Sequence, residues 1–183
     1  MLLVPKRFFL TRGIGYHKDK LGSFEMALRD AGIEVCNLVS VSSILPPECE
    51  EIPAEEGIRE LKSCAGAITF CVLSRLESDE PHRLLSAAVG IAKPMDPRQY
   101  GYLSEYHPFG KTDAECGDYA EDLAAEMYAS ARGFEIDVDK AYLEAEDLWL
   151  IGGERVKTYH ISVDASPQPG SWCSVLAAAV FLI

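Results

Sequence analysis

The sequence predicts an α+β fold, built as a single domain in which β-sheets are covered by helices. Predicted strands outnumber predicted helices, and two substantial helices are interspersed among the strands. The chain has 183 residues, the size of one ordinary domain, and it contains no repeat, low-complexity segment or linker that would divide it. We therefore expect one domain over residues 1–183.

The N-terminal quarter predicts a strand, a helix and a second strand. Val4–Leu10 is expected to form the first strand, which the Gly13-Ile14-Gly15 run ends as a turn. Lys18–Ala31 has apolar residues at helical spacing and is followed by a glycine, a typical C-cap. Val35–Ser42 alternates between two faces and stops before Pro46-Pro47, which indicates a strand that runs into a turn.

The rest of the chain predicts further strands around a long helix. A short helix is expected at Ala54–Leu61, and Thr112 with Glu115 forms a capping box that opens a helix to about Arg132. The segment Glu77–Arg83 is expected to be an exposed acidic turn. The predicted strands are Gly66–Leu73, Leu84–Ala92, Tyr100–Tyr106, Val156–Val163 and Trp172–Leu182.

The charge balance restricts the class of partner. Lys and Arg number 17 and Asp and Glu number 29, for a formal net charge of -12. Such a chain cannot neutralise a row of phosphates, so we expect neither a nucleic-acid nor an anionic-membrane partner. No apolar stretch reaches the roughly 18 residues of a membrane helix, and no secretory signal is visible, so the expected location is cytoplasmic.

The six cysteines and four histidines are scattered along the chain. No C-x-x-C pair and no zinc-like spacing occurs, so the sequence predicts reduced thiols and no metal site. Cysteines among small or apolar neighbours are expected to pack as small hydrophobes; these are Cys36, Cys64, Cys71 and Cys173. The sequence assigns no role to His17, to Cys49 or to the acidic turn.

The most informative stretch is a serine pair between a predicted strand and two prolines. Residues 37–47 read N-L-V-S-V-S-S-I-L-P-P. The pattern alone indicates a turn with its serine hydroxyls hydrogen-bonded locally. A second interpretation is chemical: in a strained peptide the Ser43 hydroxyl attacks the Ser42 carbonyl carbon and shifts the acyl group from nitrogen to oxygen. β-Elimination of that ester frees Ser42 as a C-terminus and leaves dehydroalanine, which hydrolyses to ammonia and a pyruvoyl group.

Five blocks of the sequence, in matching order and spacing, resemble the pyruvoyl-dependent arginine decarboxylases. The blocks are residues 37–47 with the serine pair, Ser23–Ile33 like the family's first helix, Leu84–Ala92 like its small-residue strand, Gly101–Tyr106 and Ser174–Phe181. They span most of the chain, and one of them carries the cleavage dipeptide. On this resemblance the chain is identified as a member of that family.

The resemblance implies a self-cleaving precursor that is cut between Ser42 and Ser43. The products are a β chain, Met1–Ser42, and an α chain, 43–183, which begins with a pyruvoyl group derived from Ser43 and stays packed with the β chain as one domain. This covalent cofactor forms a Schiff base with the α-amine of arginine and accepts the electrons released as carbon dioxide leaves. The product is agmatine, an entry into polyamine synthesis.

Three further side chains match site residues of the family. Glu105 matches a catalytic glutamate, a general acid that a partly apolar setting keeps protonated. Asn37 matches an asparagine near the processing and substrate site, and Glu25 matches an acidic ligand of the guanidinium that is aspartate in some members. Without the family, the three are a strand-end glutamate, a polar residue at a strand start and a solvated helix residue.

The fold that the resemblance implies is an αββα sandwich. Its protomers associate as trimers or dimers of trimers, with active sites between neighbours. Two alternatives remain: a pyruvoyl decarboxylase of another amino acid, and an unprocessed, non-catalytic relative that binds a small molecule. A comparison of substrates distinguishes the arginine enzyme from a decarboxylase of another amino acid. A mass measurement distinguishes a cleaved enzyme from an unprocessed relative.

Overall fold

The computed structural model describes residues 2–134, 142–143 and 148–183 of the chain. In this part, three helices accompany two sheets. The helices are α1 (Lys20–Asp30), α2 (Ala54–Lys62) and α3 (Asp113–Ala131). The strands are β1 (Arg7–His17), β2 (Asn37–Ser40), β3 (Ile44–Leu45), β4 (Glu50–Glu51), β5 (Ile68–Ser78), β6 (Leu85–Pro94), β7 (Gly101–Tyr106), β8 (Tyr142–Leu143), β9 (Leu148–Ile151), β10 (Glu154–Ala165) and β11 (Trp172–Leu182).

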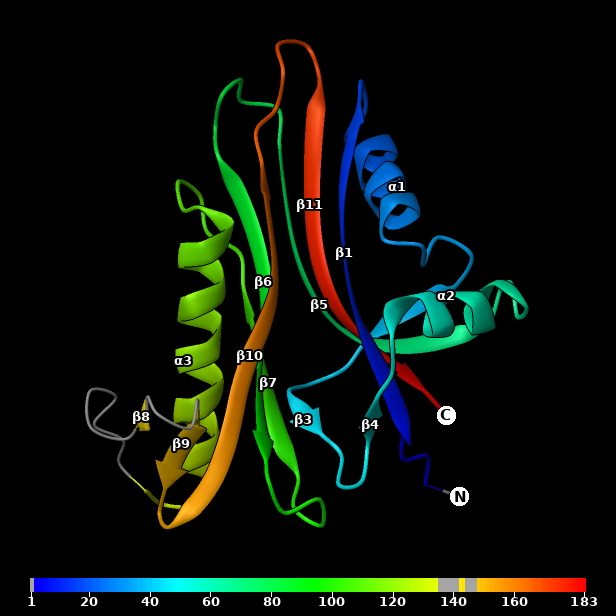
Figure 1. Cartoon of the computed structure of the whole chain (residues 1–183). Coiled ribbons are helices and arrows are strands. Elements are labelled where there is room, and N and C mark those ends of the chain that lie inside the picture. Colours follow the sequence, from blue (N-terminus) through cyan, green and yellow to red (C-terminus); the bar gives the residue numbers. More distant parts are fainter. Residues whose placement is uncertain (1, 135–141, 144–147) are drawn as a thin grey trace.

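The elements stack in four layers (Figure 1). Sheet A has the strand order β2-β5-β11-β1-β4, and sheet B has the order β3-β7-β6-β10-β9-β8. Helices α1 and α2 cover the outer face of sheet A, and α3 covers the outer face of sheet B. The predicted α+β class with helices over sheets is confirmed, in the order helices, sheet A, sheet B, helix.

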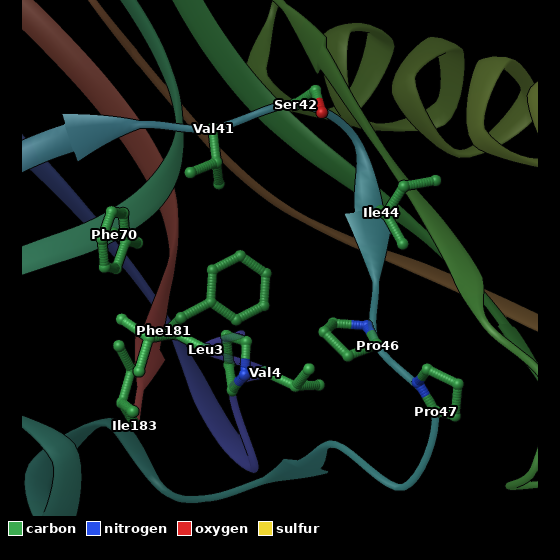
Figure 2. A pocket seen from close by; sticks show the side chains of 11 residues that line it. Leu3, Val4, Val41, Ser42, Ile44, Pro46, Pro47, Phe70, Phe181 and Ile183 are labelled. Carbon is green, nitrogen blue, oxygen red and sulfur yellow. The ribbon is translucent and has the colours of Figure 1, made fainter. Parts of the chain in front are cut away.

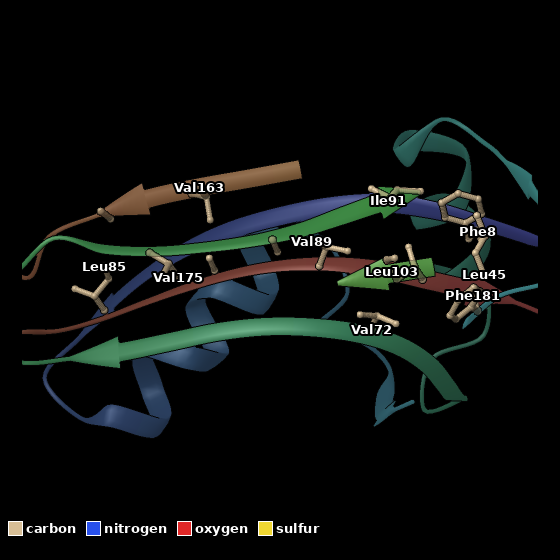
Figure 3. Packing of buried hydrophobic residues seen from close by; sticks show 14 of the residues in the cluster. Phe8, Leu45, Val72, Leu85, Val89, Ile91, Leu103, Val163, Val175 and Phe181 are labelled. Carbon is tan, nitrogen blue, oxygen red and sulfur yellow. The ribbon is translucent and has the colours of Figure 1, made fainter. Parts of the chain in front are cut away.

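The main core lies between the two sheets. Side chains of β6 and β7 in sheet B, among them Val89, Ile91 and Leu103, meet Val72 and Val175 of sheet A (Figure 3). A second apolar cluster lies under α1 and α2, and smaller ones lie under α3. Because both faces of the central strands are covered, β6 and β11 are buried almost throughout, which explains their unbroken runs of small and apolar residues.

The first strand is longer than the sequence predicts, and the expected turn at residues 13–15 is wrong. Strand β1 runs through both glycines and pairs antiparallel with β11 over its whole length, from Arg7 with Leu182 to His17 with Trp172. A Cβ at Gly13 would lie 2.2 Å from the Ala27 carbonyl oxygen of α1. The glycines therefore serve close helix-on-strand packing rather than a turn.

The ends of other elements also differ from the prediction. Strand β5 continues to Ser78, so the predicted acidic turn begins later, and the Glu77 side chain is only 11% exposed because Arg75 and Lys20 pair with it. Strand β6 extends to Pro94, two residues beyond the predicted end at Ala92. The capping box of Thr112 with its glutamate is confirmed at the start of α3.

The six cysteines are free thiols, but they do not all pack as predicted. Cys71 and Cys173 are buried, Cys36 is half-buried and Cys64 is exposed, so the expectation for Cys64 is wrong. Among the described residues, no three His, Cys, Asp or Glu side chains gather as metal ligands. The described helices include none with the length and apolar character needed to cross a bilayer.

Candidate active site at the junction of the two sheets

The serine pair lies where the chain passes from one sheet to the other. Strand β2 pairs parallel with β5 as far as Ser40 opposite Cys71, and the next N–H, of Val41, still donates to the Cys71 carbonyl oxygen at 3.0 Å. Beyond it, Ser43 already belongs to sheet B, because its carbonyl oxygen accepts from the Leu103 N–H at 2.7 Å. We call residues 41–43 the crossing segment; it carries the Ser42–Ser43 peptide.

The crossing segment bends in a three-residue turn. The N–H of Ile44 donates to the Ser42 carbonyl oxygen at 3.0 Å, which closes a γ-turn centred on Ser43. Ser42 is exposed and Ser43 is half-buried. Neither serine has a positive φ, so the backbone is not in the left-handed region. The turn instead places a hydrogen-bond donor on the carbonyl next to the Ser43 hydroxyl.

Glu105 reaches the same place from β7. The pairing of β2 with β5 ends at Cys71. Beyond that point, the next N–H on the same edge of β5 that has no partner from β2 is that of Leu73, and it donates to the Glu105 carboxylate. Glu105 follows Leu103 by two residues, about 7 Å along the strand. The carboxylate therefore spans from sheet B to sheet A near the crossing segment, which makes hydrogen bonds to the same two strands at Cys71 and Leu103.

The environment of Glu105 raises its pKa. The neighbouring strands remove part of the hydration of its carboxyl group, which disfavours the charged form; nearby His107 and the Leu73 N–H act in the opposite direction, and burial prevails. As a residue Glu105 is nevertheless exposed in the single chain, so the burial concerns only part of its carboxyl group. The direction agrees with the predicted setting of a general acid.

An apolar pocket of about 440 Å³ borders the crossing segment. Val41 points into it from above, towards Phe70 and Phe181 (Figure 2). Ile44 and the prolines that follow form another wall, and the two ends of the chain contribute Leu3 and Ile183. Ser42, the first residue of the serine pair, thus lies at the rim of an apolar cavity.

Asn37 lies at the far end of β2 from the serine pair. It pairs with Ile68, three residues before the pair of Ser40 with Cys71, so that about 10 Å of strand separate Asn37 from Ser40. Its side-chain amide donates to the Gly66 carbonyl oxygen at 2.9 Å. Within one chain the amide is engaged locally.

Glu25 lies on α1, which packs on β1 and β11. Its side chain is 44% exposed, and one carboxylate oxygen accepts from Nε of Arg29 at 2.9 Å. Glu25 therefore already holds a guanidinium, but that of its own helix. The single chain brings together Ser42, Ser43 and Glu105, and it does not join Glu25 or Asn37 to them.

Two backbone groups of the candidate site cannot be recognised in the sequence. The N–H groups of Leu73 and Leu103 hold the Glu105 carboxylate and the Ser43 carbonyl oxygen. Backbone donors leave no compositional trace, so only the pairing of the strands reveals them. Leu103 does fall inside the block Gly101–Tyr106 that resembles the family.

The fold and this junction define a two-sheet α+β protein whose candidate centre is a serine pair with a partly desolvated glutamate. Comparison with known proteins is specific. The family model described as pyruvoyl-dependent arginine decarboxylase matches residues 7–183. The chain therefore belongs to the pyruvoyl-dependent arginine decarboxylase family, whose cofactor is a covalently bound pyruvoyl group.

Individual relatives match over nearly their whole length. The chain is 50% identical over 182 residues to a probable pyruvoyl-dependent arginine decarboxylase of Chlorobium limicola, covering 100% of this chain and 99% of the relative. It is 49% identical over 181 residues to pyruvoyl-dependent arginine decarboxylase 2 of Methanosarcina mazei, covering 98% of each. A probable pyruvoyl-dependent arginine decarboxylase of Chloroherpeton thalassium is 47% identical over 183 residues, covering 100% of both chains.

Proposed function

We propose that the chain cuts itself between Ser42 and Ser43, and that the mature protein then converts L-arginine to agmatine and carbon dioxide. Family membership and the names of the relatives support the overall reaction. The observation that carries the assignment to these residues is the crossing segment itself. The Ser42–Ser43 peptide lies between two fixed backbone contacts, to Cys71 and to Leu103, with the Glu105 carboxylate beside it.

The processing steps use groups of the chain, and only the last step needs water. The Ser43 hydroxyl attacks the Ser42 carbonyl carbon; a C–O bond forms, the peptide C–N bond breaks, and the hydroxyl proton moves to the nitrogen, which becomes a free amine. Negative charge that develops on the Ser42 oxygen during the attack meets the N–H of Ile44. Loss of the Ser43 Cα proton then expels the Ser42 carboxylate, and water converts the resulting enamine to a ketone and ammonia.

The residues around position 43 fit a pyruvoyl group. A pyruvoyl group supplies a carbonyl for the substrate amine and an acceptor for the electrons released with carbon dioxide. The Leu103 N–H holds the carbonyl oxygen of residue 43, so that the electron acceptor is fixed and its developing charge is stabilised. Glu105, with its raised pKa, carries the proton that replaces carbon dioxide on the α-carbon.

Glu25 and Asn37 enter this proposal through an assembly of copies. We place the guanidinium on Glu25 and the substrate carboxylate or oxyanion on Asn37, both brought to the serine pair between neighbours in a trimer or a dimer of trimers. Large apolar side chains exposed on β2, on β3 and at the start of β5 support such a contact. They are Val39, 39% exposed, Ile44, 41% exposed, and Ile68, 68% exposed.

Denaturing mass spectrometry of the purified protein tests the cleavage. We expect two chains, residues 1–42 and 43–183, with the longer one blocked at its N-terminus. Ser43→Ala is expected to remain one chain and to release no carbon dioxide from arginine, whereas Ser40→Ala, an exposed serine of β2, is cut normally. A single intact chain in the wild-type protein after maturation contradicts the proposal.

Substrate choice has its own assay. Release of carbon dioxide from arginine is compared with release from lysine, ornithine and histidine, and arginine is expected to have the highest kcat/KM. A higher value for another amino acid would favour a pyruvoyl decarboxylase of different specificity. Neither result depends on the mass measurement, so cleavage and specificity are tested separately.

A further inference from the structure

Two consecutive residues of β5 hold two consecutive residues of β7. The Leu73 N–H donates to the Glu105 carboxylate, and the next residue, Ser74, donates its hydroxyl to the Tyr106 carbonyl oxygen at 2.8 Å. These strands belong to different sheets and do not pair with one another in either one. The two contacts are therefore a bridge across the sandwich at the edge where the chain crosses.

Ser74 is suited to this position because it lies among apolar residues that face sheet B. The neighbours on the same face of β5, Val72 and Leu76, belong to or pack against the core between the sheets. Ser74 itself is fully buried. A hydroxyl there contributes nothing to apolar packing, and the cost of burying it is offset by its bond to the Tyr106 carbonyl oxygen. An alanine would fill the site with less desolvation, so the serine points to a requirement other than core stability.

From this geometry we infer that Ser74 is a positioning residue for Glu105: its hydroxyl fixes the end of β7 against β5, so that the carboxyl group of Glu105 stays beside residue 43. The inference rests on the proposed role of Glu105 as the proton donor. The Tyr106 carbonyl oxygen also accepts from the Cys116 thiol of α3 at 3.5 Å, a longer and weaker contact. The hydrogen bond from the Ser74 hydroxyl is the stronger of the two, and it is the one that joins β7 to sheet A.

Loss of the hydroxyl has a defined electrostatic consequence. The groups that act on the pKa of Glu105 are His107 on its own strand and the Leu73 N–H of β5; Glu105 in turn raises the pKa of the nearby Cys71 thiol, also on β5. Burial between the strands is the largest influence. When β7 loosens from β5, the partly desolvated carboxyl group gains further hydration, and its pKa moves down towards the ordinary value for glutamate. A proton donor with a lower pKa is less often protonated at neutral pH.

The test uses an uncut precursor, which carries no pyruvoyl group. In a Ser43→Ala background, the titration of Glu105 is followed by carbon-13 NMR of its carboxyl group, and the signal is assigned by its loss in Glu105→Gln. We expect Ser74→Ala to lower the pKa of Glu105 and Ser74→Thr, which keeps the hydroxyl, to restore it. Ser74→Cys keeps the volume with a weaker donor and is expected to lie between the two, which covers the case that the alanine variant does not fold.

The mature protein provides the second measurement. Ser74→Ala is expected to lower kcat for arginine about tenfold with little change in KM, because the proton donor and not the binding of substrate is misplaced. Thr11→Val is the matched control, since it removes a buried hydroxyl whose bond to the Ala31 carbonyl oxygen at 2.7 Å joins β1 to α1. This control is expected to leave both the titration and kcat unchanged.

The outcomes separate the inference from the proposed function. An unchanged titration of Glu105 in Ser74→Ala overturns the positioning role, as does an equal shift in Thr11→Val. Normal turnover in Glu105→Gln instead overturns the proposed role of Glu105 as the acid. That result is read from a different variant, so the two failures are distinguishable.

Discussion

The Leu103 N–H donates to the Ser43 carbonyl oxygen at 2.7 Å, and this bond ties the serine pair to the strand that carries Glu105. A residue on β7 and a residue 60 positions earlier in the chain thereby share one edge of sheet B. The distance between the acid and residue 43 is set by strand geometry rather than by a flexible loop. The arrangement leads to specific expectations for variants.

Replacement of Glu105 by glutamine removes the proposed proton donor while keeping the shape of the side chain. We expect kcat for arginine to fall about 10²- to 10⁴-fold, the range typical of a lost general acid. Cleavage into two chains is expected to proceed, as judged by mass spectrometry. Glu50→Gln, an exposed glutamate of β4, serves as the control. Turnover within a few-fold of wild type in Glu105→Gln would remove Glu105 from this role.

The raised pKa of Glu105 predicts the direction of a pH effect. The protonated form is the active acid, so kcat is expected to fall as pH rises through this pKa. The stability of the fold depends on pH in the same direction, because the folded chain binds the Glu105 proton more tightly than the unfolded chain does. The contribution of Glu105 to the free energy of unfolding therefore falls as pH rises from the ordinary pKa of glutamate to the raised one. Kinetics and urea unfolding at several pH values check both. A kcat that rises over this interval would contradict the assignment.

Glu25 is expected to govern the affinity for arginine. In Glu25→Gln a charge-assisted hydrogen bond to the guanidinium becomes a neutral one, which we expect to raise KM about tenfold or more with a smaller effect on kcat. Arg29→Gln tests the competing internal pair, because it frees the Glu25 carboxylate without removing it. Steady-state kinetics of both variants are informative: equal KM values in wild type and Glu25→Gln would exclude Glu25 from the site.

Gly15 is expected to tolerate no side chain. A Cβ there would lie 2.0 Å from the Ser23 carbonyl oxygen and 2.3 Å from the Ala27 nitrogen, both rigid backbone atoms of α1. Gly15→Ala should lower the free energy of unfolding by about 1–3 kcal/mol, the usual cost of overpacking. In Gly22→Ala the atoms nearest to the new Cβ belong to the imidazole of His17, a half-exposed side chain that can shift more readily than backbone. Urea unfolding should show a much smaller effect for this second variant.

Local pattern was sufficient for most of the elements. The alternating and apolar runs predicted β5, β6, β7, β10 and β11, and the capping box located the start of α3. The failures share one physical cause. At Gly13 and Gly15 the residue type reports a close approach by α1, and at Glu77 the charge is held by partners from other elements. Such contacts are made by residues distant in sequence, so no local window contains them.

The candidate site was predictable only in part. The serine pair and Glu105 stand out once several blocks resemble one family, whereas their placement beside one another depends on two strands from different sheets. The bonds from Leu73 and Leu103 come from backbone groups that every residue has. The positions of Glu25 and Asn37 relative to the serine pair stay predictions, because one chain does not bring them to it.

Strand β1 lies inside sheet A, with β11 on one side along all 11 of its residues and β4 on the other side at its start. The N-terminal fragment up to Ser42 thus contributes β1 and β2 to the same sheet as the C-terminal strand. A cut after Ser42 leaves this fragment held by an entire ladder of hydrogen bonds, as in a split protein. Polypeptides 1–42 and 43–183 made separately should therefore reassemble by strand complementation, and scission of the folded precursor should be nearly silent in its circular dichroism.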